Sequence, residues 1–193
     1  MAVFCYHTSM ETDTINKLYK AAEKHLEEHQ CSAHPYKHGE KLVEMVQQQN
    51  SKRVLEIGSG IGYTAALVVL TSPNIRIDTL EKDPAHANLI RKFLRDNTKD
   101  KTAWDRVTVF NDFAETVLPM MQTQYDFIFF DGYQIHYEFL PQYKRLLKTG
   151  GILFLANNHL KSKTSDKFFE ELADTKIWKI LEQFDDTTIA QRV

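Results

Sequence analysis

The chain has 193 residues, of which 42% are hydrophobic and 26% are charged, and its formal net charge is −2. This length fits one globular domain. The small negative charge makes a nucleic acid an unlikely partner, because no basic field would attract a phosphate backbone. The apolar runs are too short to span a bilayer, and no secretory signal is visible at the N-terminus. Cys5 and Cys31 form neither a metal-type spacing nor a disulfide framework, which is typical of a protein in a reducing cytoplasm.

Residues 1–50 are expected to be helical. A first helix is predicted from about Thr12 to Gln30, with apolar residues at every third or fourth position. These apolar positions are Ile15, Leu18, Tyr19, Ala22 and Leu26. Pro35 interrupts the pattern, because the residue before a proline is pushed out of the helical region. A second helix is predicted to end near Asn50. The first helix has no obvious partner in the rest of the sequence, so we expect it to cap a cleft or to pack across a dimer interface.

From residue 53 onward, short apolar runs alternate with longer amphipathic segments. Strands are predicted at 53–57, 75–80, 107–110, 125–130 and 152–156, and helices at 63–70, 84–97, 115–122, 137–148 and 165–173. Asp83 is the expected N-cap of the helix that starts at Pro84. The alternation indicates an α/β fold with a doubly wound parallel sheet. Strands at 178–184 and 187–193, separated by Asp185 and Asp186, predict an antiparallel hairpin at one edge.

The first strand runs into a glycine-rich turn that is expected to bind a ligand. The segment reads Glu56-Ile57-Gly58-Ser59-Gly60-Ile61-Gly62. Ligands of open α/β sheets bind beyond the carboxyl ends of the strands, and glycines let them approach the backbone. A dinucleotide fingerprint would need a different spacing, since the third glycine comes one position early. The turn therefore suits an aminoacyl-nucleoside better than a pyrophosphate.

Glu81 ends the second predicted strand, 19 residues after Gly62. A carboxylate at this place in nucleotide-binding α/β folds accepts hydrogen bonds from the ribose hydroxyls. The alternative interpretation is a solvated glutamate at a strand end. Together with the glycine turn, Glu81 is interpreted as the ribose ligand.

Six ordered segments carry a resemblance to a known family. They are residues 54–65, 80–84, 107–109, 117–119, 126–131 and 147–153. The chain resembles class I methyltransferases that use S-adenosylmethionine (SAM), and more narrowly the catechol and caffeoyl-CoA O-methyltransferase family. The resemblance implies a seven-strand sheet in the order 3-2-1-4-5-7-6, SAM as cofactor and the ability to form a homodimer. We expect one domain over 1–193, with a helical cap at 1–50 and a Rossmann-like core at 51–193.

The resemblance also implies a set of cofactor-binding residues by position. Glu56, Gly58 and Tyr63 would lie at the amino-acid end of SAM, and Glu81 would hold the ribose. The adenine pocket would contain Phe113, where the family more often has a polar residue, so that buried core is an alternative for this ring. The remaining implied cofactor contacts are Ser59, Gly60, Gly62, Lys82, Ala114 and Asp131.

The sequence departs from the family where the family binds a divalent cation. Members hold it with an Asp after strand four and an Asp-Asn pair after strand five, and a lysine three residues after the first Asp acts as base. Here Asp131 is present, but residue 134 is Gln134 and the pair reads Ala156-Asn157. Even with Asn158, this set offers a single carboxylate, whereas Mg²⁺ prefers anionic oxygen ligands. No metal is predicted at this site.

Two histidines lie in the altered region. His136 follows Asp131 by five residues, and His159 follows Asn157 by two. A neutral imidazole oriented by Asp131 can accept a proton from an acceptor hydroxyl. Such a set could also bind a softer metal such as zinc, and the remaining alternative is two surface histidines.

The function predicted from these residues is SAM-dependent methylation of an oxygen on a small molecule, without Mg²⁺. Asp131, His136 and His159 are the candidate catalytic residues. Two alternatives remain open: a nucleic-acid methyltransferase, and a SAM-binding module without turnover.

Overall fold

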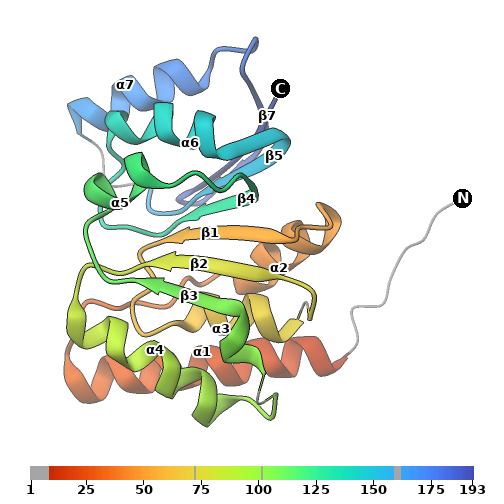
Figure 1. Cartoon of the computed structure of the whole chain (residues 1–193), viewed down its shortest axis with the longest axis vertical. Helices are drawn as coiled ribbons and strands as arrows, with labels where there is room; N and C mark the ends of the chain where they lie inside the picture. Colours follow the sequence, from red (N-terminus) through yellow and green to blue (C-terminus); the bar gives the residue numbers. More distant parts are fainter. Residues whose placement is uncertain (1–8, 72, 101, 159–161) are drawn as a thin grey trace, which may run out of the picture.

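A seven-stranded sheet in the order β3-β2-β1-β4-β5-β7-β6 organises the chain (Figure 1). The structure is a computed structural model that describes residues 9–71, 73–100, 102–158 and 162–193. The strands are β1 (Arg53–Ile57), β2 (Arg76–Leu80), β3 (Val107–Phe110), β4 (Tyr125–Phe130), β5 (Leu147–Leu155), β6 (Trp178–Phe184) and β7 (Thr187–Arg192). The first five pair in parallel, while β7 runs antiparallel to both β5 and β6. The predicted strand order and antiparallel hairpin are confirmed.

Helices cover both faces of this sheet. They are α1 (Ser9–His29), α2 (Gly39–Gln48), α3 (Tyr63–Thr71), α4 (Pro84–Asn97), α5 (Ala114–Met120), α6 (Leu140–Leu146) and α7 (Lys163–Leu172), with short 3-10 turns η1 (Ala103–Arg106) and η2 (Tyr137–Phe139). Buried residues of α1 to α4 form one core, and those of α5 to α7 form the other. Figure 1 shows α1, α3 and α4 on one side of the strands and α6 and α7 on the opposite side.

The period of two along each strand explains how one sheet supplies both cores. In β4, Phe127 and Phe129 belong to the core under α1 to α4, whereas Ile128 and Phe130 belong to the core under α5 to α7. Successive side chains of a strand point to opposite faces. A strand that is buried on both faces is therefore apolar over its buried length, as β4 is from Phe127 to Phe130.

Helix α1 packs within the chain, against α3, α2 and α4. Its residues Ile15, Leu18 and Ala22 are buried in the core on that side of the sheet. The ring of Tyr19 meets Tyr63 of α3 edge-on, with 5.9 Å between the centroids. The helix for which the sequence showed no partner thus covers α3. None of the described helices is long and apolar enough to cross a membrane.

One predicted boundary is wrong. The sequence pattern predicted a helix over 137–148 followed by a strand at 152–156, but α6 ends at Leu146 and β5 already begins at Leu147. Leu147 is fully buried and pairs with Tyr125, and a register shift follows in β4. Gly150, at φ +81°, adopts a left-handed conformation that costs glycine little. The glycine pair therefore lies inside the strand instead of preceding it.

Candidate active site

A cleft of about 860 Å³ lies along the carboxyl ends of the parallel strands, at the edge to which β1, β2 and β3 point in Figure 1. The glycine turn after β1 and the chain after β2 and β4 form its floor, and α1 with residues 32–37 forms its outer wall. Small-molecule pockets have volumes of roughly 300–1,000 Å³. This cleft is therefore large enough for a nucleoside and a small second molecule.

The glycine turn is shaped by positive φ angles and by close neighbours. Gly58 has φ +86° and Gly62 has φ +94°. A Cβ on Gly58 would lie 2.7 Å from the backbone oxygen of Asp131, and a Cβ on Gly62 would lie 2.7 Å from Ile90 of α4. Only glycine satisfies both demands at these positions. Gly58 therefore presents bare backbone to the cleft, together with Ser59 and Gly60, whereas the predicted cofactor contact Gly62 does not line the cleft and packs against α4.

Glu81 stands at the end of β2 and is fixed by the backbone around it. Its Oε2 accepts a hydrogen bond from the N–H of Gly60 (2.7 Å), and its Oε1 accepts one from the N–H of Asp83 (2.9 Å). Asn111 holds the same strand end by donating to the carbonyl of Glu81 (2.7 Å). Each carboxylate oxygen keeps a second lone pair. Glu81 is therefore pre-oriented to accept two further hydroxyl groups, and Lys82 beside it also lines the cleft.

Glu56 is a fully buried carboxyl group next to the glycine turn. The hydroxyl of Thr79 donates to its Oε2, but Oε1 has no hydrogen bond of normal geometry within the described residues. Burial, and then the negative charge of Glu81, raise the pKa of Glu56 to about 8 in spite of hydrogen bonds from Thr79 and Thr64. A ligand cation close to Glu56 would favour the charged carboxylate.

Three further predicted cofactor residues line the cleft. Phe113 is 57% exposed, so it is not part of the core and its ring is available to a ligand. Ala114 follows it at the start of α5. Tyr63 is 4% exposed, and its hydroxyl lies against Gly39 of α2, where an added Cβ would be 2.4 Å away.

At the position where the family has its metal ligands, Asp131 and Asn157 are joined by a side-chain hydrogen bond. The side-chain amide of Asn157 donates to Oδ1 of Asp131 (2.9 Å) and to the carbonyl of Gly132 (3.1 Å). Asn157 adopts φ +61°, a left-handed conformation that asparagine tolerates better than most residues, and Ala156 is fully buried. Burial, and then Glu56, raise the pKa of Asp131 well above its ordinary value.

This donor set does not fit Mg²⁺. Asn157 turns an N–H donor toward Asp131, whereas a shared cation would require its oxygen there. Within the described ranges, Asp131 belongs to no group of three His, Cys, Asp or Glu side chains whose ligand atoms lie within 4.8 Å.

The predicted catalytic histidines have different outcomes. His136 lines the cleft and packs edge-on against Phe139, with 5.5 Å between ring centroids. The hydrogen bond to Asp131 comes from Asn157 rather than from His136. His159 lies outside the described residues.

Sequence reasoning missed the β6–β7 turn as a wall of the cleft. Asp186 lines the cleft, and Asp185 forms an ion pair with Lys37 (3.4 Å) and contacts Nε2 of His38 (3.0 Å). The predicted strand order, with an antiparallel last strand beside β5, already contained the signal. In the structure, Leu155 at the carboxyl end of β5 pairs with Thr188 near the start of β7. An antiparallel β7 beside β5 necessarily brings the preceding turn to the edge where ligands bind.

The strand order, the glycine turn and the strand-end glutamate together define the fold of class I methyltransferases. A family model described as O-methyltransferase matches residues 6–188, and the chain belongs to this family. The resemblance inferred from the motifs is thereby confirmed.

Solved structures share the fold at low sequence identity. An O-methyltransferase from Bacillus cereus in complex with SAH is 21% identical, with a TM-score of 0.75 over 99% of this chain and 93% of that chain. The O-methyltransferase TomG from Streptomyces achromogenes, in complex with SAM, is 17% identical, with a TM-score of 0.75 over 98% of this chain and 92% of that chain. A putative caffeoyl-CoA O-methyltransferase from Staphylococcus aureus is 19% identical, with a TM-score of 0.72 over 91% and 92%.

Proposed function

We propose that this O-methyltransferase transfers a methyl group from SAM to an oxygen of a small molecule and that it does so without Mg²⁺. The observation that carries the proposal is the combination of an intact nucleoside cradle with an Asp131–Asn157 pair that does not fit a hard cation. The complexes of the Bacillus and Streptomyces proteins with SAH and SAM support the choice of cofactor.

The residues of the cleft fit SAM. The carboxyl group of Glu56, which is buried next to the glycine turn and does not itself line the cleft, suits the ammonium group, and the bare backbone at Gly58 suits the adjoining carboxylate end. Glu81 accepts the ribose hydroxyls, and Phe113 covers the adenine. When bound, SAM supplies a methyl group that is made electrophilic by its positively charged sulfur.

The chemistry left to the protein is positioning and proton removal. A lone pair of the acceptor oxygen forms the new C–O bond while the C–S bond breaks, and its electrons remain on the sulfur. The acceptor hydroxyl must also lose its proton. In our proposal Asp131 orients this hydroxyl, and His136 or His159 accepts the proton.

The walls of the cleft favour a small acceptor. Tyr19 and Ala22 of α1, residues 32–37 and Asp186 enclose the space next to Asp131. In our proposal residues 1–50 form the cap and 51–193 the core of one domain. We further propose that the protein is cytoplasmic and forms a homodimer, which light scattering at several concentrations would test.

The test of the proposed function is turnover after exhaustive dialysis against EDTA. Formation of S-adenosylhomocysteine is followed over a panel of phenols and other small hydroxylated molecules, with and without added Mg²⁺. We expect equal rates in both arms, because Asp131 is the single carboxylate that the proposed site offers and Mg²⁺ prefers anionic oxygen ligands. Activity that disappears on dialysis and returns only with Mg²⁺ would show that Asp131 and Asn157 suffice as ligands. SAM binding without turnover on any acceptor would favour a binding module instead.

A further inference from the structure

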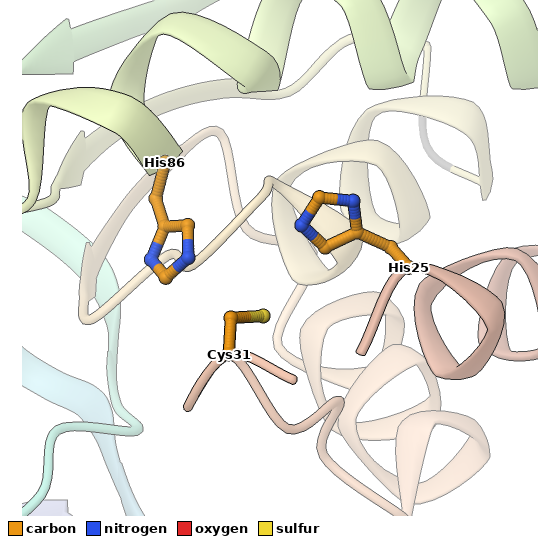
Figure 2. A group of neighbouring side chains, drawn as sticks. All are labelled: His25, Cys31 and His86. Carbon is orange, nitrogen blue, oxygen red and sulfur yellow. The ribbon is translucent and has the colours of Figure 1, made fainter. Parts of the chain in front are cut away.

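Three side chains with metal-binding chemistry converge outside the Asp131 site. His25 of α1, Cys31 of the α1–α2 connection and His86 of α4 each offer one ligand atom, and these atoms lie within 4.8 Å of one another. Figure 2 shows that each imidazole ring turns one nitrogen toward the space it shares with the Cys31 sulfur. All three residues are half-buried, so they are both shielded and accessible to an ion.

We propose that His25, Cys31 and His86 bind a Zn²⁺ ion, or another borderline-soft divalent cation. Thiolate and imidazole are the ligands that Zn²⁺ prefers. Tetrahedral zinc with ordinary bond lengths holds sulfur and nitrogen ligands about 3.3–3.6 Å apart. Spacings of up to 4.8 Å therefore require the side chains to close by about an ångström, which small rotamer changes provide.

The surroundings of His86 support this assignment. Oδ2 of Asp83 lies 3.9 Å from Nδ1 of His86, while Oδ1 of Asp83 caps α4 by accepting the N–H of Ala85. Zinc-binding histidines commonly present their second nitrogen to a carboxylate, which orients the ring. In Figure 2 the other nitrogen of His86 faces Cys31 and His25.

The surroundings of His25 point the same way. The ring of His29, one helical turn away, lies 4.4 Å from that of His25 between centroids. His29 or a water molecule would complete a fourth coordination position.

A bound ion at this place would connect the cap to the nucleoside cradle. It would join α1 and the start of the 32–37 wall to α4, whose residue His86 itself lines the cleft. Ala33 lies against Gly60, where an added Cβ would be 3.0 Å from the Cβ of Ala33. The ion would therefore hold the wall on the glycine turn, a role that goes beyond methyl transfer itself.

The test is a titration of tag-free, reduced and chelator-treated protein with Co²⁺, which replaces Zn²⁺ in such sites and gives visible spectra. We expect equimolar binding with a thiolate-to-cobalt charge-transfer band and d–d bands of tetrahedral intensity. Added Zn²⁺ should displace Co²⁺ and remove both. The readout is binding, so it does not depend on whether the proposed methyl transfer is correct.

Matched variants assign the ligands. Cys31→Ser should abolish the charge-transfer band, and His25→Asn and His86→Asn should each weaken binding at least tenfold. His34→Asn removes an exposed histidine three residues from Cys31 and should leave the cobalt spectrum and affinity unchanged. The same cobalt result is expected for Cys5→Ser and Asp131→Asn. Circular dichroism before titration verifies that each variant is folded. Absence of the band in the unmodified chain, its survival in Cys31→Ser, or its loss in Asp131→Asn would overturn the proposal.

Discussion

At the scale of single residues, two carboxyl groups near the glycine turn are placed differently. Glu81 lines the cleft and accepts hydrogen bonds from two backbone N–H groups. Glu56 is fully buried, and its burial, followed by the charge of Glu81, raises its pKa. Substitution of Glu81 should therefore remove hydrogen bonds to a ligand, whereas Glu56 should make ligand binding depend on pH.

Glu81→Ala should weaken SAM binding by more than tenfold. The variant loses hydrogen bonds to a charged acceptor, which contribute about 1.5–3 kcal/mol. Isothermal titration calorimetry measures the change, and NADH should show no measurable binding to either protein. Unchanged affinity for SAM in the variant would remove Glu81 from the cofactor site.

Glu56 should release a proton when SAM binds at pH 7. Its pKa of about 8 in the free protein means that the carboxyl is largely protonated there, and an ammonium ligand lowers that pKa. The affinity that depends on Glu56 should accordingly rise with pH and level off above about 8. Calorimetry in two buffers of different ionisation enthalpy reports the proton directly. Glu56→Gln keeps the shape of the side chain, and proton release of equal size in this variant would assign the proton to another group.

At the scale of the elements, α1 has both a structural and a site-building face. Leu18 is fully buried against the core, while Tyr19 and Ala22 reach the cleft. Deletion of α1 would therefore confound the loss of the cleft wall with the loss of core packing. A point substitution separates the two contributions.

Leu18→Ala should destabilise the fold by about 2–5 kcal/mol, because it removes a buried side chain and leaves a cavity. Urea unfolding followed by circular dichroism measures the change. Lys24→Ala in the same helix is the control: the Lys24 side chain is 72% exposed, and surface changes of this kind stay within about 0.5 kcal/mol. A loss as small as that of the control would mean that α1 is not integral to the core.

At the scale of the whole molecule, the strand pattern could be predicted from the sequence, whereas the clusters of polar side chains could not. Alternating apolar runs and glycine turns are local signals, and the N-cap at Asp83 and the order of the sheet are confirmed. The boundary between α6 and β5 was predicted wrongly because an apolar residue such as Leu147 fits a buried helix end as well as the start of a buried strand. The His25–Cys31–His86 cluster joins residues that have no metal-type spacing, so only the packing of α1 on α3 and α4 brings them together. The hydrogen bond from Asn157 to Asp131 likewise depends on a side-chain orientation that no pattern encodes.

Acid should unfold the molecule partly through Asp126, which connects β4 to β1 and β5. Burial alone would raise its pKa, but hydrogen bonds from Lys148 and from the backbone N–H groups of Lys52 and Arg53 lower it below the ordinary value. A lowered folded-state pKa adds stability above the unfolded pKa of about 3.9, and this stability is lost as the pH falls through the folded value. Asp126→Asn should therefore cost about 1–2 kcal/mol at pH 7 and progressively less below pH 4. Urea midpoints across this range measure the difference, and a cost that is constant with pH would contradict the assignment.

The position of β7 has a consequence for synthesis on the ribosome. β7 is the last strand in the chain, yet it lies between β5 and β6. Until residues 187–192 have emerged, β5 exposes an unpaired backbone edge and β6 has no neighbour, although every strand of the nucleoside cradle has already been made. Exposed edges recruit strands of other chains. A chain truncated near residue 186 would thus carry the glycine turn and all earlier strands on a sheet with an unpaired edge, which is prone to aggregate.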